Sequence, residues 1–152
     1  MSEYIKNPHT HSCMDFSHFF NEDQVTGDQT FYIEKSNFRK IQCKEVKTVE
    51  LITLMPDNRL FFIEAKTTAP NANNSANKER MDEYYNDLVE KIQQSVDMVV
   101  SHIIGVKRDQ DNEFPAAFFE TEFSQYKLKY LLIIRNSNKD WCFDVKDRLE
   151  RR

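Results

Sequence analysis

Two runs of β-forming residues with a turn signal between them restrict the fold of this chain more than any other feature. They occupy residues 48–68, with the sequence TVELITLMPDNRLFFIEAKTT. In the middle, Pro56 fixes φ near −65° and Asn58 tolerates a left-handed backbone conformation, so Pro56-Asp57-Asn58 supplies turn chemistry. This pattern predicts an antiparallel hairpin.

A long amphipathic helix is predicted from about Lys78 to Ile104, after a polar linker at residues 69–77. Gly105 stands where a glycine commonly ends a helix. The apolar residues of the helix fall in one stripe at 100° per residue: Tyr85, Leu88, Val89, Ile92, Val96, Val99, Val100 and Ile103.

Two further elements follow the helix. Tyr126 to Arg135, YKLKYLLIIR, has the apolar run of a fully buried strand, and Trp141 to Arg152 has a helical pattern. Because the long helix can serve as a crossover, this last strand can pair in parallel with the hairpin. The predicted fold class is therefore α/β, with a mixed central sheet and helices on both faces.

The N-terminal part is less regular. Residues 1–29 are polar and are predicted to form an arm carrying a short helix, and residues 30–152 form a single α/β domain. Residues 30–37, TFYIEKSN, are ambiguous between a short helix and a strand. Phe38 to Cys43 alternates apolar and polar residues, which predicts a first strand.

Composition excludes several classes of function. With only 2 Gly among 152 residues, no glycine-rich phosphate loop can be written. The longest apolar run is about five residues, far short of a membrane span. Three scattered cysteines and no secretory signal suit the cytoplasm. The net charge of −4 argues against bulk electrostatic coating of nucleic acid, but not against a local basic face.

The residues that carry chemistry are Glu50, Glu64 and Lys66. A three-residue hairpin loop places Glu50 directly opposite Glu64, with Cβ atoms ~5 Å apart, which is destabilising in a plain sheet. A divalent metal would reverse that penalty, and Lys66 has the same strand parity as Glu64. Two carboxylates, a lysine and a metal suit phosphodiester hydrolysis, in which the lysine would position or deprotonate water or offset phosphate charge.

Two alternatives stand beside this interpretation. A Glu-x-Lys sequence on a solvated strand face is common, and a two-residue loop would pair Glu50 with Ala65 instead. Against the first alternative, Glu64 and Lys66 interrupt the otherwise apolar run LFFIEA, and charges in such a run require a reason.

At these residues the chain resembles the PD-(D/E)XK nuclease superfamily, the restriction-endonuclease-like fold. The resemblance spans roughly residues 30–135 and rests on the acidic residue in the second strand, on Glu64-Ala65-Lys66, on the following helix and on YLLIIR. It implies a core in α-β-β-β-α-β order and a Mg²⁺- or Mn²⁺-dependent nuclease acting on DNA or RNA. The literal Pro56-Asp57 dipeptide lies at the hairpin tip, so the family's first acidic position falls on Glu50, a glutamate in place of the usual aspartate.

The resemblance also implies residue roles. Glu50 and Glu64 would hold the metal, and Glu50, Glu64 and Lys66 would be catalytic. Additional family positions fall on Glu34, in the first helix, and on Gln93, in the helix after the hairpin, whereas Gln94 points away from the apolar stripe. An 18 kDa nuclease that cuts both strands would act as a homodimer.

Other residues have weaker signals. A basic run before the hairpin would contact phosphates if it lines the site, and would otherwise be a solvated face; it comprises Lys35, Arg39, Lys40, Lys44 and Lys47. His9, His11 and Cys13 alternate but lack a fourth zinc ligand, which favours a polar arm. The second hypothesis for function is a catalytically inactive module of the same fold that binds nucleic acid or a protein, and the third is an unrelated α/β domain.

Overall fold

The computed structural model describes residues 27–42, 45–71, 77–135 and 139–151. Most of the predicted N-terminal arm, including the His9, His11 and Cys13 trio, lies outside these residues, as does Lys44. None of the described helices is long and apolar enough to cross a membrane.

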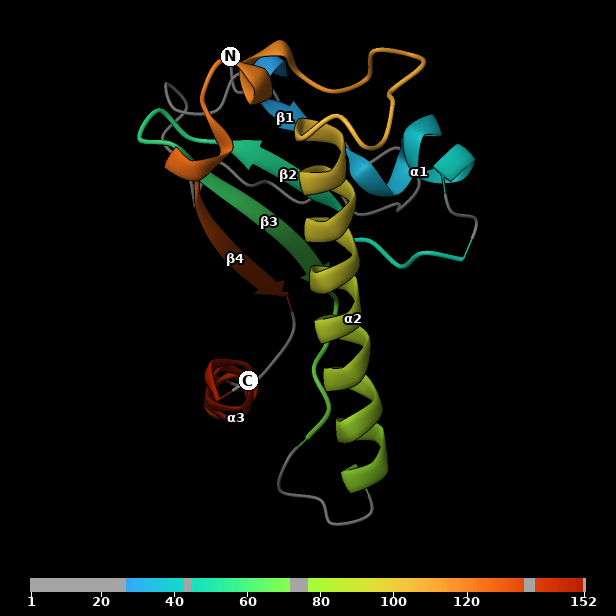
Figure 1. Cartoon of the computed structure of the whole chain (residues 1–152). Helices are drawn as coiled ribbons and strands as arrows, with labels where there is room; N and C mark the ends of the chain where they lie inside the picture. The colour runs from blue at the N-terminus through green and yellow to red at the C-terminus, as the bar shows by residue number, and fades with distance from the viewer. Residues whose placement is uncertain (1–26, 43–44, 72–76, 136–138, 152) are drawn as a thin grey trace.

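A four-stranded mixed sheet forms the centre of the described fold (Figure 1). Its strands are β1 (Thr30–Phe31), β2 (Leu51–Leu54), β3 (Arg59–Lys66) and β4 (Lys127–Ile134), in the order β1-β2-β3-β4. The β1–β2 and β2–β3 pairs are antiparallel, and β3 and β4 are parallel. The predicted α/β class and mixed sheet are confirmed, and the parallel pair is the one that the crossover helix makes possible.

The hairpin has the predicted register. Leu51 pairs with Ile63 and Leu54 with Leu60, which corresponds to the three-residue loop. Asn58 adopts φ 62°, and its N–H donates to the Met55 carbonyl at 3.0 Å. The ladder stops one residue short of the predicted Glu50–Glu64 pair, because the Glu50 N–H donates to the Ile63 carbonyl at 3.1 Å. Glu50 and Leu51 thus both face Ile63 across the ladder.

The predicted strand over Phe38 to Cys43 is wrong in its described part, because helix α1 (Asn37–Gln42) occupies it. The N–H groups of its first turn find side-chain acceptors: Ser36 Oγ accepts from Arg39, and the distant Glu113 carboxylate accepts from Asn37 and Phe38. Such caps satisfy the orphan donors of a helix start. The preceding segment, 30–37, divides between β1 and a 3₁₀ turn at Ile33–Lys35. The described order is therefore β-α-β-β-α-β-α rather than α-β-β-β-α-β.

Helix α2 (Lys78–Ile103) has the predicted extent. After the helix, Gly105 adopts φ 79°, its N–H donates to the His102 carbonyl and the Val106 N–H donates to the Ser101 carbonyl, which is a Schellman ending. Its buried side is offset from the predicted stripe: Met81, Tyr85, Leu88, Ser95, Met98 and Val99 are buried, while Val89, Ile92, Val96, Val100 and Ile103 are partly exposed. On this buried side, Ser95 Oγ accepts from the Val49 N–H at 2.9 Å, which ties α2 to the segment before β2.

The described helices pack on one face of the sheet. Ile52, Leu60 and Phe62 form a core with Met98 and Val99 of α2. Helix α3 (Lys139–Glu150) joins the N-terminal half of α2 and β4 through Val145 and Leu149 in a second cluster. The cluster on the opposite face contains no residue of these helices: Leu51, Ile63, Ile133 and their partly buried neighbours Tyr32, Phe61, Ala65 and Leu131. Helices on both faces, as predicted, are therefore not found among the described residues.

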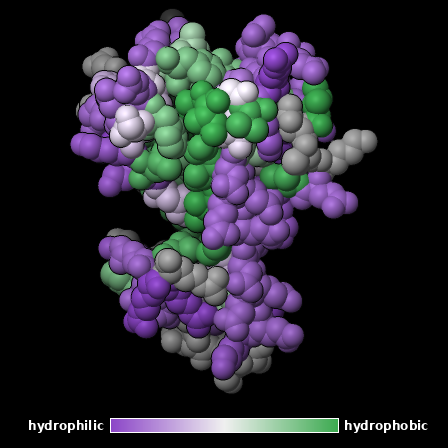
Figure 2. Space-filling model, viewed as in Figure 1, coloured by the Kyte–Doolittle hydropathy of each residue, from purple (hydrophilic) through white to green (hydrophobic). Residues whose placement is uncertain are grey.

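Strand β4 is not the fully buried strand that its apolar run predicts. It pairs with β3 at the end of the described strand order, and its first three residues are exposed. Leu128 is 41% exposed, and Ile133 is its one buried residue. Figure 2 shows hydrophobic side chains gathered near the C-terminal end of α2, where Ile104 and Val106 are exposed, and a mainly hydrophilic surface along the rest of that helix.

Candidate functional site

Glu64 is the centre of the candidate site. Its side chain is 1% exposed near the end of β3, beside α2 (Figure 1). Two ammonium groups share its Oε1 atom: Lys91 Nζ of α2 at 2.7 Å and Lys66 Nζ of β3 at 3.1 Å. Lys66 reaches Glu64 because residues two apart on a strand point to the same face. Glu64 is therefore buried and Lys66 is partly buried, and both contact side chains of α2 and do not lie on a solvated strand face.

The ion pairs continue along α2 toward solvent. Lys66 Nζ lies 3.3 Å from Asp87 Oδ2, and Lys47 Nζ lies 3.1 Å from Asp87 Oδ1. Lys47 also pairs with Glu90 at 2.8 Å. Burial opposes the charged form of Lys66, but Glu64 and Asp87 together hold its pKa above the ordinary lysine value. Lys66 is therefore an ammonium at neutral pH, which suits charge stabilisation and excludes a role as general base in this state.

Glu50 has the most informative electrostatics in the described chain. Burial, followed by repulsion from Glu64 and Glu34, raises its pKa to about 7, against the opposing influence of Lys91 and Lys35. Glu34 and Glu64 therefore lie near enough to Glu50 for their charges to act on its carboxyl. A carboxyl that titrates near neutrality can accept a proton at physiological pH.

The raised pKa of Glu50 gives a prediction for stability. The folded state binds a proton at Glu50 more tightly than the unfolded state, so stability should fall as pH rises from about 4.5 to about 7 and then level. After allowance for solvent screening of this half-buried group, the loss should be about 1–2 kcal/mol. Thermal unfolding in EDTA across this range should show the decline in wild type and a flatter profile in Glu50→Gln. Identical profiles would contradict the assignment.

Two buried oxygen atoms in the region of Glu50, Glu64 and Lys66 lack hydrogen-bond partners within the described residues. Glu64 Oε2 is buried and unpaired, and so is the Tyr130 hydroxyl on β4. Burial and then the charge of Glu64 raise the pKa of Tyr130, which keeps the phenol neutral. Buried polar atoms are usually paired with protein groups, ordered water or an ion, so Glu64 Oε2 is open to any of these partners.

These features fit a divalent cation. The described residues contain no group of three or more His, Cys, Asp or Glu side chains arranged to hold a metal ion. Mg²⁺, however, is usually held by one or two carboxylates together with waters and substrate phosphates. Glu50 and the unpaired Glu64 Oε2 are the candidate ligands, since the charge of Glu64 acts on Glu50, and a cation between them would relieve the repulsion that raises the pKa of Glu50.

Gln93 does not join the site. Its side chain is exposed on α2, whereas Gln94 is half-buried and its Oε1 accepts from the Lys47 N–H at 2.7 Å. The sequence favours Gln93 over Gln94 because Gln93 flanks the predicted apolar stripe of this helix. The buried side of α2 is offset from that stripe, so Gln93 is exposed and Gln94 is the more buried of the two. Gln94 also donates to Glu90 at 3.0 Å, which ties it to the outer ion pairs.

The predicted basic run is dispersed. Lys35 lies near enough to influence Glu50, but Lys47 is engaged by Asp87 and Glu90. Arg39 donates to the backbone carbonyls of Val46 and Glu34, and Lys40 is exposed. Within the described residues, Lys35 is thus the member of this run that lies beside the acidic cluster.

Sequence reasoning missed Lys91 and Asp87. A signal for Lys91 exists, because it continues the buried spacing Leu88, Lys91, Ser95, Met98 of α2 at steps of three and four. A lysine in a buried stripe requires a partner, as Glu64 does in its apolar strand. Pairing the lysine in the buried stripe of α2 with the glutamate in the apolar strand would have predicted the Lys91–Glu64 ion pair.

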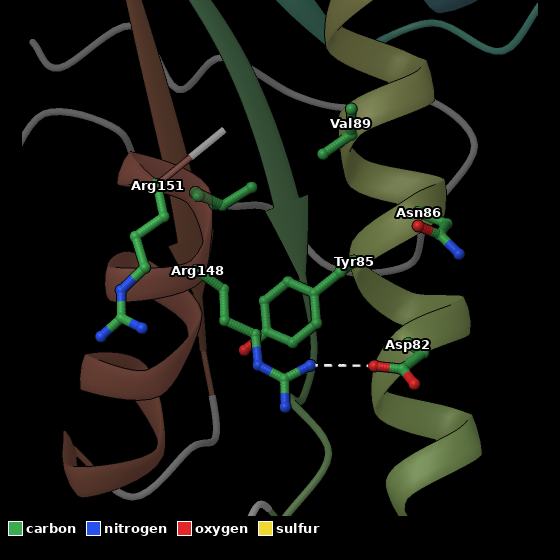
Figure 3. Close-up of a pocket in the computed structure, with 7 residues that line it drawn as sticks. Asp82, Tyr85, Asn86, Val89, Arg148 and Arg151 are labelled. Atoms are coloured by element: carbon green, nitrogen blue, oxygen red, sulfur yellow. Dashed lines mark hydrogen bonds and ion pairs between the residues drawn. The ribbon is translucent and has the colours of Figure 1, made fainter.

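A separate hollow lies between α2 and α3, with a volume of about 470 Å³. It is lined by Asp82, Tyr85, Asn86, Val89, Arg148, Leu149 and Arg151. Figure 3 shows Arg148 between the Tyr85 ring, 4.7 Å from its centroid, and the Asp82 carboxylate, 2.9 Å away. Arg151 pairs with Asp147, so both guanidinium groups are neutralised, and none of the predicted site residues lines this hollow.

Comparison of the chain with protein-family models, with curated proteins and with solved structures found no match in any of the three.

Proposed function

We propose that this protein is a Mg²⁺-dependent phosphodiesterase, a nuclease acting on DNA or RNA through Glu50, Glu64 and Lys66. The observation that carries the proposal is the buried Glu64, which has an unpaired Oε2, contacts the Lys66 ammonium at 3.1 Å and repels a Glu50 carboxyl whose pKa is raised to about 7. Two carboxylates with one free oxygen, and a lysine fixed beside them, are the groups that phosphodiester hydrolysis requires.

The roles follow from these contacts. Glu50 and Glu64 would hold Mg²⁺ or Mn²⁺, which supplies Lewis-acid stabilisation of phosphate charge when bound. Lys66, held by Glu64 and Asp87, presents an ammonium that offsets charge on the scissile phosphate or orients the attacking water. The charge of Glu34 also acts on Glu50, and the Glu34 carboxylate would help to orient water.

The proposed partner is nucleic acid, and the proposed location is the cytoplasm. Lys35 would lie against the substrate backbone, since it is already close to the acidic cluster. A homodimer would allow both strands of a duplex to be cut.

Cleavage of nucleic acid tests the proposal directly. Wild-type protein with millimolar Mg²⁺ or Mn²⁺ should cut plasmid DNA, single-stranded DNA or a structured RNA, and EDTA should stop the reaction. The matched control is Lys146→Ala, because Lys146 is exposed on α3 and belongs neither to the site nor to the predicted basic run. Wild-type protein that cuts none of these substrates with either metal would contradict the nuclease proposal.

One observation favours a second candidate, a catalytically inactive module of the same fold. Glu64 Oε1 already accepts from two lysines in the absence of metal, so the charges of β3 are partly compensated within the protein. In that case the same face would bind nucleic acid or a protein partner without cleavage. Binding of labelled DNA or RNA in EDTA, with no cleavage in Mg²⁺ or Mn²⁺, would support this candidate.

A further inference from the structure

Lys91 of α2 is a second ammonium on the Glu64 carboxylate, besides Lys66 of β3. It comes from α2, is 15% exposed, and its Nζ lies 2.7 Å from Glu64 Oε1, closer than Lys66. Its charge also lowers the pKa values of Glu50 and Asp87, although burial is the largest influence on both. The ammonium therefore stands among the carboxylates that would hold a metal.

The two lysines on Glu64 differ in their other contacts. Lys66 is shared between Glu64 and Asp87, which hold it in place from both sides. Among the described residues, Lys91 forms its ion pair with Glu64 alone. Lys91 can consequently leave Glu64 without breaking a second ion pair, since its long side chain can carry the ammonium toward solvent.

We propose that Lys91 is an internal cation that opposes binding of the divalent metal at Glu64: its ammonium holds Oε1, so a metal at the unpaired Oε2 must displace it or bind against its charge. This inference deepens the proposed function and rests on it for the metal. Without metal, Lys91 compensates the buried carboxylate and keeps the site folded. With metal, two cations would meet at one carboxylate, and their repulsion in a buried site is strong. Lys91 thereby sets the metal concentration at which the site fills.

The test is a measurement of metal affinity, independent of cleavage. Lys91→Gln keeps a hydrogen-bond donor for Glu64 and removes the charge, so its affinity for Mn²⁺ by calorimetry should be about tenfold tighter than wild type, or more. Lys91→Arg retains the charge and should bind no more tightly than wild type. Lys47→Gln removes a charge from the same chain of ion pairs without touching Glu64, and should change affinity less than about threefold, as a surface charge does.

The outcomes separate this inference from the nuclease proposal. If Lys91→Gln is too unstable for calorimetry, the rise in its melting temperature with added Mn²⁺ replaces the affinity, and it should exceed the wild-type rise. Unchanged or weaker affinity, or an equal gain in Lys47→Gln, overturns the inference. Tighter binding without cleavage by any variant supports competition and counts against a nuclease. Cleavage by wild type, together with unchanged metal affinity in Lys91→Gln, supports the nuclease proposal and contradicts the role of Lys91.

Discussion

Replacing Lys66 with alanine should reduce metal-dependent cleavage by about 10²- to 10⁴-fold while the protein remains folded. Lys66 contributes an ammonium whose pKa is held above its ordinary value by Glu64 and Asp87. Glu64 keeps Lys91 at 2.7 Å when Lys66 is removed, so the buried carboxylate does not become unpaired. Metal binding should survive the substitution, because the proposed ligands Glu50 and Glu64 are unchanged and one of the two ammonium groups on Glu64 Oε1 is removed.

Single-turnover cleavage and Mn²⁺ calorimetry on the same preparation check this expectation. Lys146→Ala is the matched control, because it also removes an ammonium but Lys146 lies exposed on α3, outside the site and the predicted basic run. It should keep nearly full activity. A Lys66→Ala protein that cleaves at the wild-type rate would remove Lys66 from the proposed chemistry.

Replacing Glu64 with alanine should destabilise the protein by about 3 kcal/mol or more and abolish cleavage. From the sequence, opposed negative charges of Glu50 and Glu64 suggested a slight gain in stability without metal. The structure reverses the sign, because Glu64 is 1% exposed and compensates the ammonium groups of Lys91 and Lys66. Its loss leaves Lys91 mostly buried without its partner, and relief of repulsion on Glu50 offsets only part of this.

Urea unfolding of the two proteins in EDTA measures the difference. The matched control is Glu90→Ala, since Glu90 is exposed and pairs with the exposed Lys47, and its effect should stay within about 1 kcal/mol. The pKa of Glu50 should also move down toward its ordinary value in Glu64→Ala, because Glu64 is the largest charged contribution that raises it. A stability equal to or above that of wild type would mean that repulsion dominates at this carboxylate.

The sequence by itself determined the local features of the fold. Pro56 and Asn58 dictated the turn, and through its length the β2–β3 register, because backbone conformation at a tight turn depends on the residues within it. Gly105 determined the end of α2 for the same reason. The strand periodicity of two then placed Glu64 and Lys66 on one face, which is all that the predicted lysine–carboxylate contact needed.

Tertiary structure decided what depends on distant partners. The segment after Asn37 became a helix rather than a strand because Glu113, far along the chain, accepts from its first N–H groups. Strand β4 became partly exposed because its position in the strand order, and not its apolar run, decides which of its faces is covered. The buried side of α2 carries Ser95, which accepts from the Val49 N–H, and Lys91 rather than Gln93 reaches Glu64. Periodicity gives the spacing of side chains along an element, but the direction in which the element turns them is set by the surface it packs on.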